Sequence, residues 1–152
     1  MKVSILLIAL SIFANMAMAE IKNAESVTER NKQLVVDFYT DVLFYGKADA
    51  IDKYIGEVYI QHNPRVPNGK EALRKFITGF SDEGRDENPN GKIVRAVAEG
   101  DLVVLHVHNY GKSGSQGLAI VDIFRVEGDK IVEHWDVIQK IPEKSKNENT
   151  MF

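Results

Sequence analysis

Four runs of alternating apolar residues in the second half of the chain restrict the possible fold more than any other feature. The runs cover Lys92 to Glu99, Leu102 to Tyr110, Gln116 to Val126 and Lys130 to Gln139. Turns containing glycine separate them, at Gly100-Asp101, Gly111 to Ser115 and Gly128-Asp129. Such turns between alternating runs are typical of antiparallel hairpins. We therefore expect an antiparallel sheet in this half of the chain.

The first half of the chain has the apolar spacing of helices instead. Apolar residues recur every three or four positions over residues 26–45, and shorter helices are expected at 48–54 and 70–80. Residues 57–62 have the pattern of a short strand or extended connector, and the polar, glycine-containing segment 81–90 that of a loop. Helices followed by an antiparallel sheet predict an α+β domain, with the helices packed on one face of a curved sheet.

Residues 1–19 have the pattern of a cleavable signal peptide. Lys2 provides a positive charge, an apolar run follows to Phe13, and Ala17-Met18-Ala19 fits the small-x-small pattern of a signal-peptidase site. The apolar run is short for a membrane-spanning helix, so we expect no stable membrane anchor. The expected mature domain is 20–152, located in the periplasm or secreted.

Composition excludes several classes of site. There are no cysteines, so neither disulfides nor a cysteine nucleophile are available. The formal net charge of −3 gives no basic surface for nucleic acid. The sequence has no glycine-rich phosphate loop and no nucleophile elbow, which argues against covalent catalysis.

Polar side chains interrupt the last two β-runs where apolar residues are expected. Asp122 lies within the apolar segment 121–125, and the next run carries Glu133, His134, Trp135 and Asp136. A buried carboxylate is costly unless it is paired, hydrogen-bonded or protonated. This pattern favours a pocket that uses an acid, although Asp122 could also be a structural carboxylate bound to Arg125 or to a backbone amide.

The register of the strands decides which side chains face Asp122. Alternation places Val104, His106 and His108 on one face of their run, and we expect Val104 or His106 beside Asp122. In the last hairpin, a two-residue Gly128-Asp129 loop pairs Asp122 with Trp135, whereas a bulged loop pairs it with His134 or Asp136. The sequence leaves both alternatives open.

A metal site is a further alternative, since His106, His108, His134 and Asp136 are possible ligands. Their spacing permits a site without being diagnostic of one, and no HExxH motif accompanies them. The histidines also have structural interpretations: His62 could cap a turn, and His106 and His108 could bond across a solvated face of the sheet. We expect neither a metal nor another cofactor.

Several segments, taken in order, resemble one known family. They are Tyr59-Ile60-Gln61-His62-Asn63-Pro64, Gly69-Lys70-Glu71-Ala72-Leu73, Asp101-Leu102-Val103-Val104, Val121-Asp122-Ile123-Phe124-Arg125, Glu133-His134-Trp135-Asp136-Val137 and Asn149-Thr150-Met151-Phe152. This series resembles the SnoaL-like proteins, in the superfamily of nuclear transport factor, ketosteroid isomerase and scytalone dehydratase. The similarity extends from about Asn31 to Phe152.

The resemblance implies a cone-shaped, nuclear-transport-factor-like α+β fold whose curved antiparallel sheet wraps around N-terminal helices. It also implies a deep and mostly apolar pocket, often in a homodimer. Family members with known activity include polyketide cyclases that perform an intramolecular aldol closure, and isomerases that move a proton next to a carbonyl.

The resemblance also suggests roles for individual residues. The resemblance matches Asp122 to the acidic residue of ketosteroid isomerase, which an apolar site keeps protonated and neutral. His62 falls where that enzyme carries its general base, and Tyr39 falls near its oxyanion tyrosine. Asp136 is the second choice for the acid.

We therefore expect a cofactor-free lyase or isomerase that abstracts a proton alpha to the carbonyl of a small apolar compound. The catalytic residues would be His62, Asp122 and Tyr39. The expected substrate-binding residues are His106, His108, Phe76, Phe80, Phe124, His134, Trp135 and Asp136. The rival hypothesis is a non-catalytic periplasmic protein that binds an apolar small ligand in the same pocket.

Overall fold

The computed structural model describes residues 2–81, 89–110 and 115–152, with side chains for 15–79, 89–110 and 115–152. Its elements, in chain order, are α1 (Lys2–Phe38), the π-helix η1 (Tyr39–Phe44), the 3-10 helix η2 (Ala48–Ala50), α2 (Ile51–Tyr54), β1 (Ile55–Gln61), α3 (Lys70–Ser81), β2 (Gly91–Glu99), β3 (Leu102–Asn109), β4 (Leu118–Glu127) and β5 (Lys130–Lys140). Most of the segments expected at 81–90 and 111–115 lie outside the described residues.

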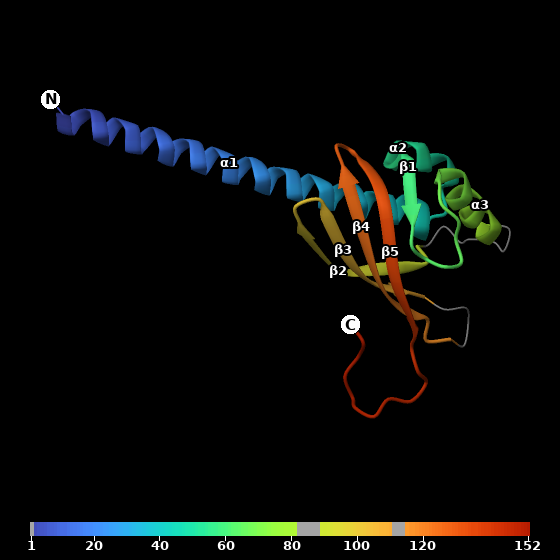
Figure 1. Cartoon of the computed structure of the whole chain (residues 1–152). Helices are drawn as coiled ribbons and strands as arrows, with labels where there is room; N and C mark the ends of the chain where they lie inside the picture. Colours follow the sequence, from blue (N-terminus) through green and yellow to red (C-terminus); the bar gives the residue numbers. More distant parts are fainter. Residues whose placement is uncertain (1, 82–88, 111–114) are drawn as a thin grey trace.

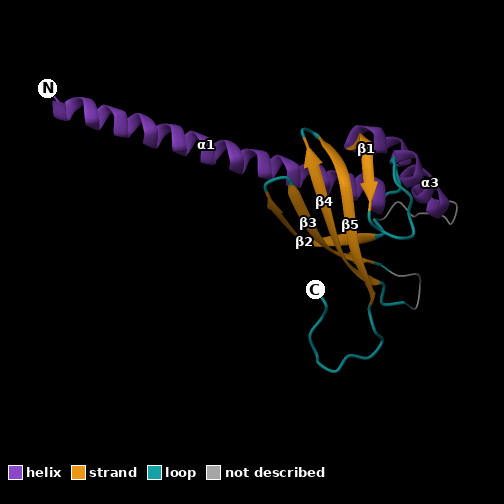
Figure 2. Ribbon diagram, in the orientation of Figure 1, coloured by secondary structure: helices purple, strands orange, loops and turns teal. Residues whose placement is uncertain are grey.

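The five strands form one curved sheet in the order β1-β5-β4-β3-β2. β2, β3, β4 and β5 pair antiparallel, as expected from the hairpin turns, while β1 pairs parallel to β5. Figure 2 shows the end of α1 crossing one face of this sheet, with α3 beside β1. The fold is therefore α+β, with helices covering the concave face.

The core lies between the helices and this inner face of the sheet. Val35, Phe38 and Val42 from the helices are buried, and so are alternate residues of the strands, including Val103, Leu105, Val107, Ile120, Phe124, Val126 and Ile131. Strand alternation explains the set, because every second side chain of a strand points to the same face.

The N-terminal part of α1 extends away from the sheet in one unbroken helix (Figure 1). Residues 15–26 of this helix are exposed. None of the helices in the described part of the chain is both long enough and apolar enough to cross a membrane. The signal peptide, its cleavage after Ala19 and the location outside the cytoplasm stay predictions.

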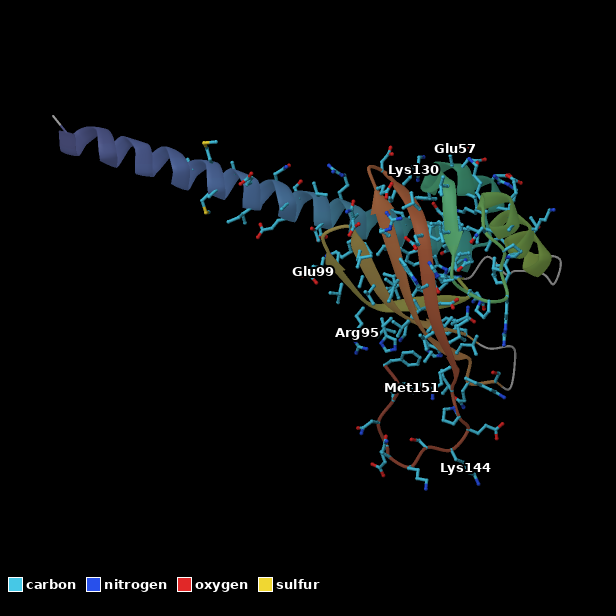
Figure 3. The ribbon with its side chains drawn as sticks, viewed as in Figure 1. Glu57, Arg95, Glu99, Lys130, Lys144 and Met151 are labelled. Atoms are coloured by element: carbon cyan, nitrogen blue, oxygen red, sulfur yellow. The ribbon has the colours of Figure 1, made fainter. Side chains whose placement is uncertain are left out.

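The outer face of the sheet exposes apolar side chains on β2 and β5. Val97 is 63% exposed and Val137 is 71% exposed. The C-terminal segment, whose Met151 is labelled in Figure 3, returns to this face, where the Phe152 ring stacks on His108 with centroids 4.3 Å apart. The homodimer implied by the resemblance stays a prediction.

The strand register differs from the expected one at one point. Asp122 pairs with Leu105, not with Val104 or His106. The odd-numbered residues of β3 therefore lie on the inner face beside Asp122, while His106 and His108 lie on the outer face. The expectation was wrong because the length of the loop between β3 and β4 does not determine the register.

Gly91 provides a test of the packing between η1 and the sheet. A Cβ atom at this position would lie 2.5 Å from the His108 carbonyl oxygen and 2.8 Å from Cε1 of Phe44. We expect Gly91→Ala to lower the free energy of unfolding by about 1–3 kcal/mol, because overpacked sites must shift their neighbours. Denaturant unfolding of the full chain measures this loss.

Gly79→Ala is the matched control, because a Cβ atom on Gly79 in α3 meets nothing within 4 Å. This variant should be as stable as the wild type or more stable by about 0.5–1 kcal/mol, since alanine is the better helix former. Equal effects of the two substitutions would contradict the packing described at Gly91.

Candidate functional site

Asp122 is the centre of a buried group of polar side chains on the inner face of the sheet. It lies on β4, is only 2% exposed, and is surrounded by core residues. Its Oδ2 atom accepts a hydrogen bond from the Tyr39 hydroxyl at 2.9 Å. Its Oδ1 atom lies 3.0 Å from Nε2 of His134, which is 7% exposed. Both carboxyl oxygens are therefore satisfied inside the protein.

A β-bulge on β5 brings His134 and Asp136 to this face. Arg125 pairs with Glu133 but Val126 pairs with Ile131, so Val132 is an extra residue on β5. Asp122 consequently pairs with Asp136, and Phe124 pairs with His134. Of the two alternatives left open by the sequence, the structure has the bulged one, with Asp136 opposite Asp122.

Trp135 lies on the opposite face as a result of the same register. Its ring stacks on the His62 ring, with centroids 4.7 Å apart and planes 6° apart. Nε2 of His62 lies 2.8 Å from Oε1 of Glu133, another outer-face residue. The structure therefore does not bring His62 to Asp122, and His134 occupies the position facing that carboxyl group.

Strand parity explains why His62 points away from the site. Gln61, its neighbour, is in register with His134 on the adjacent strand β5. The Gln61 side chain therefore shares the inner face, and its Oε1 lies 2.9 Å from Nδ1 of His134. His62, the next residue along, faces the other way.

Tyr39 reaches Asp122 from the helical layer. It is the first residue of η1, where the backbone widens to the π pattern, with Tyr45 N–H donating to the Thr40 carbonyl at 3.0 Å. Short π-helical segments occur frequently at functional sites. The expected proximity of Tyr39 and Asp122 is present, with the tyrosine donating to the carboxyl group.

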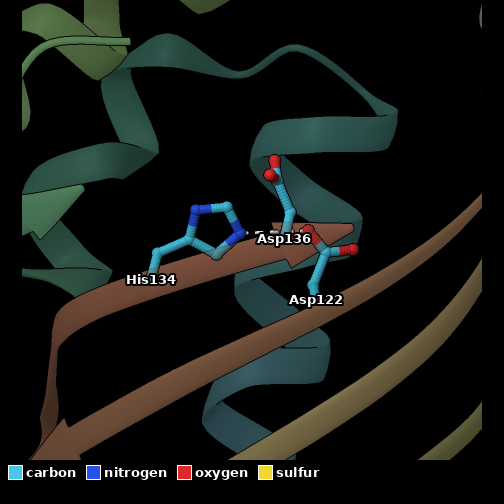
Figure 4. Close-up of side chains that lie close together, drawn as sticks. All are labelled: Asp122, His134 and Asp136. Atoms are coloured by element: carbon cyan, nitrogen blue, oxygen red, sulfur yellow. Dashed lines mark hydrogen bonds and ion pairs between the residues drawn. The ribbon is translucent and has the colours of Figure 1, made fainter. Parts of the chain in front are cut away.

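Asp136 is the more accessible carboxyl group of the site. Its side chain is half-buried, and Oδ2 accepts a hydrogen bond from Nδ2 of Asn63 at 2.5 Å. Among the described residues, its other oxygen has no hydrogen-bond partner. Figure 4 shows the Asp136 carboxylate beside the contact between His134 and Asp122.

Burial controls the electrostatics of this group. Desolvation raises the pKa of Asp122, although hydrogen bonds from His134 and Tyr39 act in the opposite direction. Burial also raises the pKa of Tyr39 well above its usual value, and the nearby charge of Asp122 adds to this effect. The tyrosine therefore remains a neutral donor.

The contact between His134 and Asp122 requires a proton. An unprotonated imidazole nitrogen and a carboxylate oxygen both present lone pairs, which repel each other at 3.0 Å. Either the imidazole donates to the carboxylate, or a protonated carboxyl group donates to the imidazole. In both forms one proton lies between the two residues.

Among the described residues, Asp122, His134 and Asp136 form a group of side chains that could together hold a cation. One ligand atom from each lies within 4.8 Å of the others. In the structure Nε2 of His134 is engaged with Asp122, and Asp136 with Asn63. The four-residue set considered from the sequence is not brought together, because His106 and His108 lie on the outer face. The expected lack of a cofactor stays a prediction.

The expected aromatic wall is only partly assembled at this site. The Phe124 ring stacks on His134, with centroids 4.6 Å apart. Phe76 on α3 is 38% exposed, and Trp135 lies on the outer face. The side chain of Phe80 lies outside the described residues.

A depression in the surface adjoins the buried group. Its volume is about 390 Å³, and it is lined by the loop from Gln61 to Asn68. Gln61 and Asn63 also contact His134 and Asp136, so the depression and the buried group share these two residues. A larger hollow of about 510 Å³, between α1 and the β2–β3 turn, contains none of the site residues.

Comparison with known sequences assigns the family. A sequence model of the SnoaL-like polyketide cyclases matches residues 33–144. The chain belongs to this family. No curated protein sequence matches it.

Solved structures confirm the expected fold. TsrD from Streptomyces laurentii is 23% identical, with a TM-score of 0.58 over 72% of this chain and 88% of that one. An NTF-2 like protein of unknown function from Burkholderia xenovorans is 16% identical, with a TM-score of 0.61 over 78% and 89%. An LEH-like epoxide hydrolase from Mycobacterium tuberculosis is 17% identical, with a TM-score of 0.55 over 74% and 84%.

The role of Tyr39 in holding Asp122 is testable through stability. Tyr39→Phe removes the donor to Oδ2 and leaves a buried carboxyl oxygen without a partner. We expect the free energy of unfolding to fall by about 1–3 kcal/mol, which is the usual cost of an unsatisfied buried polar group. Denaturant unfolding monitored by circular dichroism measures this difference.

Tyr45→Phe is the matched control, because Tyr45 is an exposed residue that follows η1 directly. Its free energy of unfolding should stay within about 0.5 kcal/mol of the wild type, as is usual for surface substitutions. A Tyr39→Phe variant as stable as this control would show that the hydroxyl group does not support Asp122.

Proposed function

We propose that this SnoaL-like protein is a cofactor-free acid-base enzyme that moves a proton at the carbon next to a carbonyl group. Its family suggests a cyclase or isomerase activity of this general kind. The observation that carries the proposal is the 3.0 Å contact between His134 and Asp122 beside the carboxylate of Asp136. An acid that holds a proton and a neighbouring base are the two groups that such a reaction needs.

Asp136 is the base in this proposal. Its carboxylate is half-buried and retains an oxygen free of hydrogen bonds among the described residues, so a substrate carbon can approach it. The Asp136 oxygen takes the proton from the alpha carbon, the C–H electron pair moves into the enolate, and negative charge develops on the substrate oxygen. Asn63 holds the other oxygen of Asp136 in place during this step.

The His134–Asp122 pair is the acid. The proton between the two residues is available to the developing enolate oxygen, and Tyr39 donates to the carboxylate left behind. Because the pair lies in the core, little water is present to screen its charge, and electrostatic stabilisation of the enolate is correspondingly strong. The fate of the enolate determines the reaction. Return of a proton to the same carbon gives exchange, and return to another carbon gives isomerisation. Attack of the enolate on a second carbonyl group gives cyclisation.

This proposal keeps the reaction expected from the sequence but changes two residues. The base is Asp136 instead of His62, which points away from Asp122 on the outer face. The histidine that works with Asp122 is His134. The ligand is a small carbonyl compound that reaches the site next to the Gln61 to Asn68 depression.

Deuterium exchange at an alpha carbon tests the proposed reaction without knowledge of the natural substrate. The probes are cyclohexanone and other monocyclic ketones in D2O, with loss of the alpha-proton signal followed by NMR. We expect the wild-type protein to accelerate exchange, and Asp136→Asn to lower this acceleration about 100-fold or more, the usual contribution of a general base.

Asp129→Asn is the matched control, because this substitution makes the same chemical change at a residue in the exposed β4–β5 turn. It should exchange at the wild-type rate. The His134→Gln and His62→Gln variants separate the two histidine assignments: only the first should lose activity. No acceleration by the wild-type protein with any ketone, together with retention of an unchanged ketone in native mass spectrometry, would favour the binding protein instead.

A further inference from the structure

Gln61 makes a contact with His134 whose chemistry is unusually well determined. Its Oε1 atom accepts a hydrogen bond from the backbone N–H of Asn63 at 2.9 Å and lies 2.9 Å from Nδ1 of His134. A backbone N–H can only donate, so the Gln61 atom that faces it is the oxygen. The amide nitrogen of Gln61 is then on the other side, 3.4 Å from the Tyr59 hydroxyl.

An amide oxygen can only accept, so Nδ1 of His134 must carry the hydrogen in this contact. We propose that Gln61 is a positioning residue that keeps a proton on Nδ1 of His134, so that Nε2 must share a second proton with Asp122. Gln61 thereby keeps two protons on the pair, one on Nδ1 and one between Nε2 and Oδ1.

The alternative arrangement shows what Gln61 changes. Without an acceptor at Nδ1, a neutral histidine can place its only proton on Nε2 and donate it to the Asp122 carboxylate. This is a satisfied hydrogen bond with one proton fewer, and the only proton that such a pair could give to a substrate is that of a neutral imidazole, which is a very weak acid. By removing this alternative, Gln61 makes the resting pair an acid.

The same short segment also holds the proposed base. Asn63 orients Gln61 through its backbone N–H and binds Asp136 through its side chain at 2.5 Å. The backbone N–H of Gln61 is in turn bound by Oδ1 of Asn68 at 2.8 Å, which closes the loop. The acid and the base are therefore set by neighbouring residues of one closed loop.

The inference deepens the proposed function and rests on it for its catalytic meaning, but its test needs no turnover. The full chain labelled with 15N-histidine gives long-range 1H–15N correlations that report the proton on each ring nitrogen. The chain has four histidines, and single His→Gln variants assign their signals. We expect Nδ1 of His134 to carry a hydrogen in the wild type at pH 7, because the Gln61 amide oxygen that faces it can only accept.

Two variants at Gln61 separate positioning from simple packing. Gln61→Met keeps the length of the side chain but removes the acceptor, so the hydrogen of His134 should move from Nδ1 to Nε2, where it can be donated to Asp122. Gln61→Glu retains an acceptor oxygen at Nδ1 and should keep the wild-type signature. Gln139→Met, the same substitution on the exposed part of β5, is the control and should leave the spectrum unchanged.

An Nδ1 without a proton in wild-type His134, or the same tautomer in wild type and Gln61→Met, would overturn the inference. Circular dichroism and thermal unfolding establish that each variant is folded, and Gln61→Glu decides the matter if Gln61→Met is not. A confirmed tautomer with no deuterium exchange would reject the proposed reaction but not the role of Gln61. Deuterium exchange by a protein whose His134 carries no hydrogen on Nδ1 would support the proposed reaction but reject the role of Gln61.

Discussion

The burial of the Asp122 carboxyl group is the constraint on which the arrangement of this protein depends. Removing a carboxylate from water costs several kcal/mol unless hydrogen bonds replace the lost solvation. Two hydrogen-bond partners on different elements provide them: Tyr39 at the start of η1 and His134 on β5. The helical layer and the last two strands must therefore be in register for the carboxyl group to be stable, which links folding of the core to assembly of the site.

The β5 bulge determines which side chains take part. In a regular hairpin with the same Gly128-Asp129 turn, Asp122 would lie opposite Trp135, and His134 and Asp136 would face outward. The extra residue, Val132, shifts the register by one and exchanges the two faces of β5 from that point. β-bulges commonly change the direction in which side chains point, and here the bulge turns one imidazole and one carboxylate toward the inner face of the sheet.

The sequence predicts the elements better than it predicts their contacts. The four β-runs, the helix expected at 70–80 and the α+β order follow from local periodicity, and Asp122 stands out because a charge interrupts an apolar run. Pairing across loops is a non-local property, so the partner of Asp122 on β3 was assigned to the wrong face. The helical spacing recognised over residues 26–45 covers only the end of a longer element, because α1 runs from Lys2 to Phe38 without interruption.

The contacts of the loop after β1 illustrate the same limit. His62 attracts attention because imidazole suits proton transfer, yet Gln61 and Asn63 on either side are the residues that contact the site. Strand alternation in the sequence indicates that Gln61 and His62 face opposite sides, but not which side is inner. The face of Gln61 is set by the parallel pairing of β1 with β5, which puts Gln61 opposite His134. These two residues are 73 positions apart, so no tight turn joins their strands and the sequence gives no sign of the pairing.

Accessibility divides the site residues into those that hold protons and those that meet a substrate. Asp122 and His134 have all their polar ring and carboxyl atoms occupied by protein partners, so a ligand cannot bind them without breaking a hydrogen bond. Asp136 is half-buried and bound at one oxygen only among the described residues. In the proposed reaction a substrate therefore meets Asp136 first, and proton transfer from the buried pair to the enolate oxygen breaks the hydrogen bond between Nε2 of His134 and Oδ1 of Asp122.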